Sequence, residues 1–248
     1  MLGECLNLDN IKKLNPVTLI VGASSEIAQE VVESMLGKEI ILVTRKLPDF
    51  FRGYTSNKKF HYIEHDLENE PVRYSDIKKI LNDDSFVENL IYLSSFQTGR
   101  MSLVDMNKED IAKTFNVNIV WCTLLIAELL RFRPLLPGSF VLFGSQAAVF
   151  GGNKISAYAA SKAAVETLVK GLARELAEYQ IRINAISLGI VKTKRLADQK
   201  DFDEKAMASS LPFNRLGTAK EVSNVVMWLL GDESSYMSGS VIAVTGGR

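Results

Sequence analysis

The chain of 248 residues contains few of the residue types that bind metals or form disulfides. It has two cysteines, Cys5 and Cys122, and two histidines, His61 and His65. Two cysteines without metal-ligand spacing predict reduced thiols in a cytoplasmic protein, not a disulfide framework. The histidines have no third candidate ligand, so we predict no metal site.

An excess of charge of either sign is also missing. Lys plus Arg and Asp plus Glu number 29 each, which gives a formal net charge of zero at pH 7. This balance favours neither nucleic acid nor anionic lipid as a partner. No uninterrupted apolar run reaches the ~18 residues of a membrane-spanning helix. The polar, acidic start MLGECLNLDNIKK is unlike a signal peptide. We therefore expect no nucleic-acid and no membrane partner.

Linkers, internal repeats and low-complexity tracts are absent as well, while hydrophobic residues make up 47% of the sequence. This predicts one domain over residues 16–248, preceded by a short arm at residues 1–15. Short apolar runs alternate with segments of helical periodicity. Strands that are apolar throughout are buried on both faces. The pattern therefore predicts an α/β fold, with a parallel sheet of about seven strands and helices on both faces.

The predicted elements follow from hydrophobic periodicity and from turn residues. Strands are expected at residues 17–21, 40–43, 60–63, 90–93, 140–143, 182–186 and 241–244. Helices are expected at residues 27–36, 72–81, 108–131, 157–179 and 222–230.

One short segment, SAYAASK at residues 156–162, places Tyr158 and Lys162 four residues apart at the start of a predicted helix. Positions i and i+4 share a helix face. Because an ammonium group stabilises a neighbouring phenolate, the pair is a candidate proton donor for a carbonyl under reduction. This spacing alone is more often a surface tyrosine beside a surface lysine, so the hypothesis depends on the rest of the chain.

The turn after the first predicted strand, GASSEIA at residues 22–28, opens the first predicted helix. Ligands of parallel sheets bind beyond the carboxyl ends of the strands, where small residues let backbone amides approach a pyrophosphate. A plain tight turn is the alternative. The residues expected to contact a nucleotide here are Gly22, Ser24, Ser25, Glu26 and Ile27.

The second predicted strand is followed by Arg45, about twenty residues beyond this turn. An acidic residue at such a position binds the ribose hydroxyl of NAD, whereas an arginine accommodates the 2′-phosphate of NADP. Arg45 therefore favours NADP over NAD, and a solvated basic loop is the alternative.

With these segments in place, the chain resembles the short-chain dehydrogenase/reductase family over residues 17–247. The resemblance implies a single-domain Rossmann-type fold, a nicotinamide cofactor and a homotetramer or homodimer. It places the catalytic tyrosine and lysine of the family on Tyr158 and Lys162. The serine of the family falls on Ser145 in LFGS, and its asparagine on Asn118 in NVNI.

The resemblance also implies further cofactor contacts. Asp66 corresponds to the acidic residue beside the adenine, and SLGIVKT at residues 187–193 to the loop beside the nicotinamide. Thr193 would bond the carboxamide. The remaining implied cofactor positions are Leu67, Ser94, Gly189 and Val191.

Some positions depart from the family pattern. Glu26 and Ala28 stand in place of glycines, YLSS at residues 92–95 replaces N-N-A-G, and Leu188 replaces a proline. These changes bear on the affinity and orientation of the cofactor and leave the four catalytic positions intact.

Residues 194–213, KRLADQKDFDEKAMASSLPF, combine charges with apolar side chains and follow the predicted nicotinamide loop. Their place predicts a substrate lid, and an ordinary amphipathic surface helix is the alternative. Candidate substrate contacts are Gln97, Phe150 and Leu196.

Residues 212–247 resemble the C-terminal region of 3-oxoacyl-[acyl-carrier-protein] reductases. The resemblance implies NADPH-dependent reduction of a carbonyl to a secondary alcohol. A 3-oxoacyl thioester is then a candidate substrate and an acyl carrier protein a candidate partner. One alternative is a dehydrogenase of a sugar, a polyol or another small carbonyl compound. Another, motivated by the altered cofactor turn, is a nucleotide-binding regulatory subunit without turnover.

Overall fold

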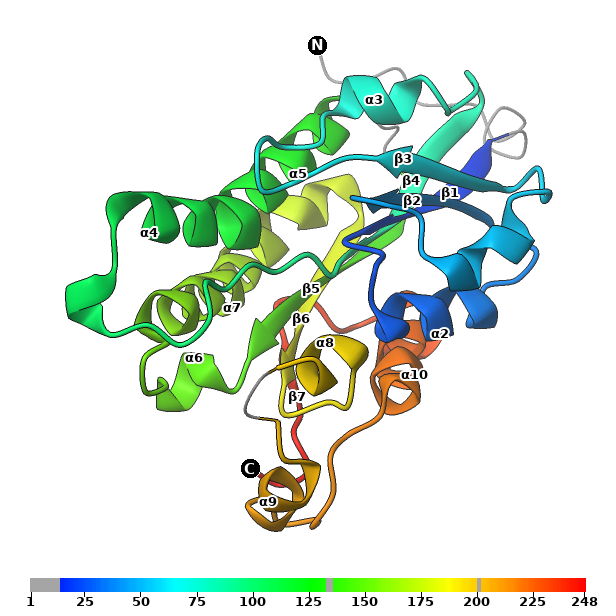
Figure 1. Ribbon diagram of the computed structural model, residues 1–248. Coiled ribbons are helices and arrows are strands. Elements are labelled where there is room, and N and C mark those ends of the chain that lie inside the picture. Colours follow the sequence, from blue (N-terminus) through cyan, green and yellow to red (C-terminus); the bar gives the residue numbers. More distant parts are fainter. Residues whose placement is uncertain (1–13, 133–135, 200–201) are drawn as a thin grey trace.

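The computed structural model describes residues 14–132, 136–199 and 202–248 (Figure 1). Almost all of the predicted arm therefore lies outside the described residues. Seven parallel strands form one sheet in the order β3-β2-β1-β4-β5-β6-β7, which confirms the predicted Rossmann-type α/β fold. The strands are β1 (Asn15–Val21), β2 (Glu39–Thr44), β3 (Phe60–Glu64), β4 (Ser85–Tyr92), β5 (Gly138–Ser145), β6 (Ile181–Leu188) and β7 (Val241–Val244).

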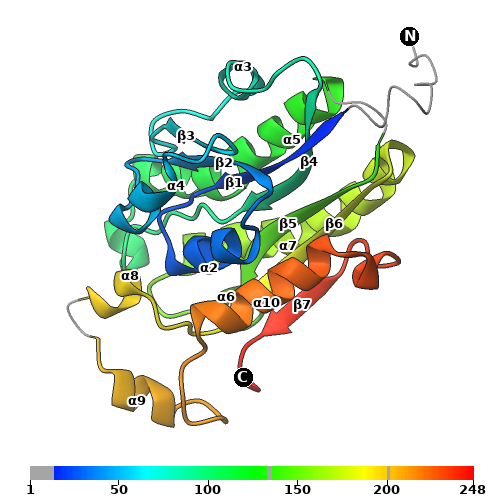
Figure 2. The same ribbon diagram turned by 90° about the vertical axis from the view of Figure 1, so that its right-hand side faces the viewer.

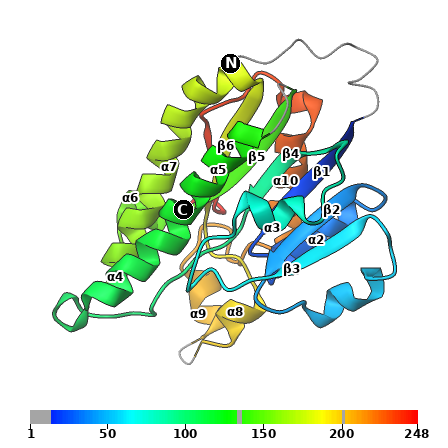
Figure 3. The same ribbon diagram turned by 90° about the horizontal axis from the view of Figure 1, so that it is seen from above.

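Helices cover both faces of the sheet. On one face lie α4 (Lys108–Phe115), α5 (Trp121–Phe132) and α7 (Ser156–Leu176). On the other lie α2 (Glu26–Ser34) and α10 (Ala219–Leu230), side by side in Figure 2. Figures 1 and 3 show α4 and α7 next to each other.

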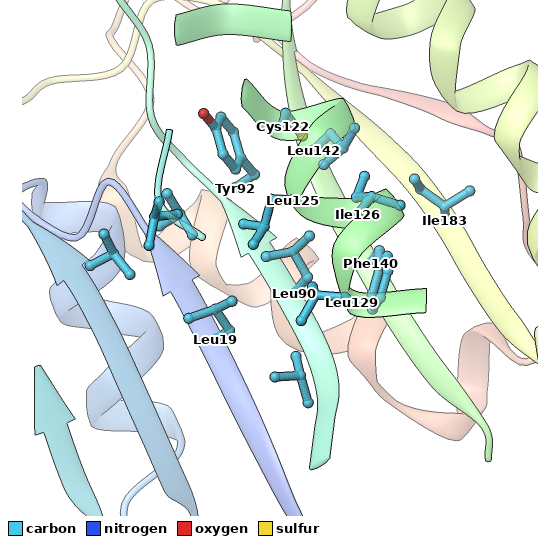
Figure 4. Close-up of a cluster of buried hydrophobic side chains, with 14 of the residues drawn as sticks. Leu19, Leu90, Tyr92, Cys122, Leu125, Ile126, Leu129, Phe140, Leu142 and Ile183 are labelled. Carbon is cyan, nitrogen blue, oxygen red and sulfur yellow. The ribbon is translucent and has the colours of Figure 1, made fainter. Parts of the chain in front are cut away.

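Each strand contributes to two separate hydrophobic cores because successive side chains of a strand point to opposite faces. In β1, Leu19 enters the core beneath α5, and Ile20 enters the core beneath α2 and α10. Figure 4 shows the first of these cores, where Leu125 of α5 packs above Leu90 of β4. Apolar residues on both faces of the strands thus place the sheet in the middle of the molecule.

The predicted helix at residues 108–131 is continuous but not uniform. A π-helical segment, Asn116–Val120, separates α4 from α5. By length and composition alone Lys108–Phe132 is apolar enough to cross a membrane, although the sequence has no uninterrupted apolar run of that length. A core helix passes the same test, and Leu125 and Leu129 of this stretch are buried against the sheet.

Other boundaries differ from the predicted ones for local reasons. The predicted helix at residues 72–81 is reduced to α3 (Tyr74–Lys78). Strand β4 begins five residues before the predicted residue 90, because Asn89 stays in the strand with its amide bonded to Thr18 Oγ1 of β1 at 3.4 Å. A 3₁₀ helix (Asp49–Tyr54) and the short α6 (Ala147–Phe150) were not predicted.

The segment predicted as a lid contains two short helices beyond the carboxyl ends of the strands. These are α8 (Lys194–Ala197) and α9 (Glu204–Ser209), seen below the sheet in Figure 1. Residues 200–201 of this segment lie outside the described part of the chain. Strand order reverses between β1 and β4, so the cleft expected for a ligand opens between the loops that follow these two strands.

Candidate active site

Helix α7 holds Tyr158 and Lys162 on one face, and Lys162 reaches the end of β5. The Lys162 side chain is buried, and its Nζ donates a hydrogen bond of 2.8 Å to the main-chain oxygen of Phe143. The same Nζ lies 5.8 Å from the centroid of the Tyr158 ring. The pair predicted from a spacing of four residues is therefore brought together in the fold, with an ammonium group beneath a phenol ring.

The environment of Lys162 changes its acidity. Burial is the main cause and lowers the pKa of Lys162 to about 8. The Arg195 guanidinium lowers this pKa further, while Cys122 and the Glu166 carboxylate oppose the shift. A lysine with such a pKa exchanges its proton readily near neutral pH.

Ser145 is the last residue of β5 and is half-buried. Its Oγ accepts a hydrogen bond of 3.2 Å from Ala147 N. Its backbone amide donates to Glu166 Oε1 of α7 at 3.3 Å. The strand end thus carries a hydroxyl group next to the helix that holds Tyr158.

Asn118 lies in the π-helical segment, where its side chain is buried. Its Oδ1 accepts from Phe96 N at 2.6 Å, and its Nδ2 donates to Phe96 O at 3.0 Å. The same Nδ2 donates to Ser161 Oγ of α7 at 2.8 Å. Asn118 therefore fastens the loop after β4 to α7. Both donors of the Asn118 amide bind protein atoms, so only the second lone pair of Oδ1 is left for another partner.

Tyr92 occupies the first position of the segment that departs from the family's N-N-A-G. Its hydroxyl group donates to the main-chain oxygen of Val117 at 2.9 Å, and burial raises its pKa. This bond ties the end of β4 to the π-helical segment beside Asn118. A buried tyrosine thus links the two elements here.

Sequence reasoning missed three residues of this region, Ser161, Glu166 and Arg195. Ser161 Oγ donates to Tyr158 O at 2.8 Å. Glu166 follows Lys162 by four residues, so the helical periodicity that led to Lys162 also contained a signal for Glu166. Arg195 donates from Nη1 to Ser95 O at 3.1 Å, which bridges α8 and the loop after β4. No sequence pattern indicates that contact.

The nucleotide turn has a close backbone approach that only glycine allows. Gly22 has φ +84°, and a Cβ placed on it would lie 2.5 Å from Ser94 N. Ser25 caps α2, with its Oγ accepting from Ala28 N at 3.3 Å, while Ile27 is buried and Ser24 is exposed. Amides of the first turn of a helix have no intrahelical acceptor, so this turn suits an anion.

Glu26, the residue that replaces a glycine, turns its carboxylate toward the other side of the cleft. Its Oε1 accepts a hydrogen bond of 2.6 Å from Lys194 N, at the start of α8. Thr193 caps the same helix through an Oγ1 that accepts from Leu196 N at 3.3 Å. The cofactor turn and the predicted lid are therefore joined directly by a residue that departs from the family pattern.

The other predicted cofactor positions line the same edge of the sheet. Gly189 is close to the last strand, since a Cβ on it would lie 2.8 Å from Thr245 Cα, and Val191 forms a bridge with Gly217. The Asp66 carboxylate accepts hydrogen bonds from Glu68 N and Asn69 Nδ2. The main-chain oxygen of Leu67 accepts from Trp121 Nε1 at 3.1 Å.

Arg45 is held by an ion pair. Its Nη1 lies 2.8 Å from Glu68 Oε1, and Glu68 Oε2 lies 3.2 Å from Lys113 Nζ. Arg45 remains mostly exposed, so an anion can reach it from solvent. One carboxylate thus neutralises part of the positive charge at this end of the cleft.

The three predicted substrate contacts lie on three different segments, α6, the loop after β4 and α8. Phe150, on α6, is 65% exposed. Gln97 donates to Gly99 O of its own loop at 3.5 Å, and Leu196 is half-buried on α8. Within the described residues, no group of three or more His, Cys, Asp or Glu side chains could hold a metal ion.

Residues 75–248 match the family model described as enoyl-(acyl carrier protein) reductase. The chain belongs to the short-chain dehydrogenase/reductase family. Members of this family are NAD(P)-dependent oxidoreductases. An L-xylulose reductase of Caenorhabditis elegans is 30% identical over 241 residues, which cover 92% of this chain and 94% of that protein.

A 3-oxoacyl-[acyl-carrier-protein] reductase of Thermotoga maritima is 34% identical over 149 residues. This match spans 58% of the chain and 59% of that protein. The solved structure of ElxO with NADP bound has a TM-score of 0.83 at 24% identity, covering 94% of this chain and 98% of that one. The structure of a 4-hydroxyisoleucine dehydrogenase with NADH has a TM-score of 0.80 at 20% identity, with the same coverage. These structures show the shared fold.

Proposed function

We propose that the protein reduces a carbonyl group to a secondary alcohol with NADPH as hydride donor. The observation that supports this most directly is the buried Lys162, with its ammonium group bonded to Phe143 O and facing the Tyr158 ring. A buried ammonium is energetically expensive, and here it lies beneath a potential proton donor. Ser145 ends the strand to which Lys162 is bonded.

The roles of the side chains follow from charge development during reduction. The bound nicotinamide would supply the hydride, which goes to the carbonyl carbon. The Ser145 hydroxyl would donate a hydrogen bond to the carbonyl oxygen, and the Tyr158 hydroxyl would transfer its proton to that oxygen. The Lys162 ammonium would stabilise the phenolate left behind. Preorganised donors of this kind often supply the largest share of the rate enhancement.

The residues of the cleft fit a dinucleotide. The close approach at Gly22 and the N-terminus of α2 directly after it suit a pyrophosphate. The negative charge of Glu26 opposes a bound pyrophosphate only in part, because the Glu26 carboxylate accepts a hydrogen bond from Lys194 N. Arg45 supports NADP over NAD, as does the NADP bound to ElxO, whereas the NADH bound to the 4-hydroxyisoleucine dehydrogenase supports the opposite choice.

For the substrate we favour a 3-oxoacyl thioester, carried by an acyl carrier protein. The Thermotoga maritima relative supports it, and so do the exposed apolar side chains of Val149 and Phe150 on α6, just beyond Ser145. Such a surface suits an acyl chain. The second candidate is a sugar or polyol, and the L-xylulose reductase that matches over nearly its whole length supports it.

We further propose a homotetramer or homodimer. Ile111, Val120 and Leu124 are exposed apolar residues along α4, the π-helical segment and α5, and a second copy of the chain would bury them. Cys122 is a free, buried thiol, which suits a reducing compartment such as the cytoplasm.

The test is carbonyl-dependent oxidation of NADPH by wild-type protein and by Tyr158→Phe, on a panel of acyl thioesters, sugars and simple ketones. We expect Tyr158→Phe to lose about 100-fold or more in kcat, the usual range for a general acid. Tyr236→Phe is the control, because Tyr236 is fully exposed. If Tyr158→Phe kept the wild-type rate, Tyr158 would not be the acid. NADPH binding without turnover on any substrate would favour a regulatory subunit.

A further inference from the structure

We infer that Glu166 is a positioning residue, which fixes the strand end at Ser145 against the helix that bears Tyr158 and Lys162. The inference rests on the proposed function for its consequence in catalysis. The contact between Glu166 of α7 and Ser145 of β5 can be tested whether or not the protein turns over a substrate.

Tyr158, Lys162 and Glu166 stand at intervals of four residues, so they form one stripe on the helix. Two members of the stripe bind the backbone of β5. Lys162 Nζ donates to Phe143 O at 2.8 Å, and Glu166 Oε1 accepts from Ser145 N at 3.3 Å. The Lys162 ammonium therefore binds a main-chain carbonyl of β5, and the Glu166 carboxylate binds a main-chain amide two residues further along the same strand.

The residue between these two contacts is Gly144. A Cβ built on Gly144 would lie 2.7 Å from Glu166 Cγ and 2.9 Å from Glu166 Cδ, and it would collide with the carboxylate itself. The absence of a side chain at this position is what lets the carboxylate reach the strand. Gly144 thus leaves the space that the Glu166 carboxylate occupies beside the strand.

The backbone groups that Lys162 and Glu166 bind would otherwise lack partners in the sheet. Pairing of β5 with β4 ends at Tyr92 and Leu142. Gln146 N donates to Leu188 O of β6, so Ser145 N, one residue earlier, faces the side where β4 has ended. Because buried backbone groups need partners, the two side chains of α7 replace the missing strand.

Glu166 also contributes charge to the site. The groups that face Lys162 are Tyr158 and Glu166 from α7, Cys122 from α5 and Arg195 from α8. Glu166 is the only carboxylate among these four groups, and it raises the pKa of Lys162 against the effect of burial. Without its charge, Lys162 would lose its proton at lower pH.

Glu166→Gln and Glu166→Ala separate the two effects. Gln keeps an acceptor oxygen for Ser145 N and removes the charge, while Ala removes both. Glu175→Ala is the matched control, because Glu175 is an exposed glutamate on the same helix. The readouts, made on the full-length protein, are the hydrogen-exchange rate of the Ser145 amide and the pH profile of kcat with NADPH and a turned-over carbonyl.

We expect Glu166→Ala to exchange the Ser145 amide on the order of 10-fold faster than wild type, and Glu166→Gln to stay close to wild type. In both Glu166 variants the alkaline limb of kcat should move to lower pH, because the Glu166 charge no longer raises the pKa of Lys162. The KM for NADPH should change less than kcat, because Glu166 is bonded to the strand and not to the cofactor turn.

Three outcomes are decisive. If the Ser145 amide exchanges no faster in Glu166→Ala than in Glu175→Ala, Glu166 has no positioning role. Faster exchange with an unchanged alkaline limb supports the positioning role and removes the role of the charge. If the wild-type protein turns over no carbonyl, or Tyr158→Phe keeps the wild-type rate, the proposed function fails, while the exchange rates still decide whether Glu166 holds Ser145.

Discussion

Lys162 Nζ lies 2.8 Å from the main-chain oxygen of Phe143, so a lysine side chain that is 2% exposed joins α7 to the end of β5. This single hydrogen bond offsets only part of the loss of hydration of the ammonium group. The protein therefore bears a cost in stability at the position where the proposed chemistry needs a positive charge.

This cost predicts an unusual dependence of stability on pH. Burial lowers the pKa of Lys162 from 10.5 to about 8. Between these values Lys162 keeps its proton in the unfolded chain and loses it in the folded one, so the contribution of Lys162 to stability rises with pH from about 8 to 10.5. Below about 8 the lysine is charged in both states, and the penalty of about 3 kcal/mol is present in full.

Lys162→Met should abolish this rise. Urea unfolding across that pH range measures it, with Lys170→Met as control, because Lys170 is an exposed lysine of the same helix. The control should keep the wild-type slope. Parallel curves for wild type and Lys162→Met would show that Lys162 has an ordinary pKa in the folded protein.

Gly22→Ala should destabilise the protein through a backbone collision. The new Cβ would lie 2.5 Å from Ser94 N, and neither atom can rotate away, because Cβ is fixed by the backbone and Ser94 N is a main-chain atom. We expect a loss of about 3 kcal/mol or more in the free energy of unfolding. Gly37→Ala isolates the strain of a positive φ, since Gly37 has φ +91° with nothing within 4 Å, and should lose about 1–2 kcal/mol. Equal losses in the two variants would disprove the collision.

Arg45→Ala should weaken NADPH binding selectively. Loss of a charge-assisted hydrogen bond to the 2′-phosphate corresponds to an increase on the order of 10-fold in the KM for NADPH, with the KM for NADH unchanged. Arg52→Ala serves as control, because Arg52 forms an exposed ion pair with Asp49. Equal effects on both cofactors would remove Arg45 from cofactor selection.

Glu26→Ala should loosen α8. The carboxylate is the acceptor for Lys194 N at 2.6 Å, so its removal exposes that amide to solvent. We expect hydrogen exchange at Lys194 to rise on the order of 10-fold, measured without cofactor. Glu33→Ala removes a carboxylate of α2 that binds Gln29, and it should leave Lys194 unchanged. Unchanged exchange in Glu26→Ala would show that the bond does not hold α8.

Much of the fold could be read from periodicity. Strands such as β1 and β2 are apolar on both faces, and this pattern needs a sheet covered on both sides. The start of β4 was misjudged because Glu88 and Asn89 break the apolar run, although the Asn89 amide finds a partner on β1. The π-helical segment at Asn118 has no signature in local sequence, since it depends on what Asn118 binds on the loop after β4 and on α7.

By itself, the sequence determined the contacts that depend on short separations. A spacing of four residues puts Tyr158 and Lys162 on one helix face wherever the helix lies. Only the tertiary structure decided that Lys162 is buried, that Glu166 binds Ser145 across 21 residues and that Glu26 reaches Lys194 across 168. Such contacts depend on how closely a helix packs on a strand end, and that distance is set by many side chains acting together and not by any local pattern.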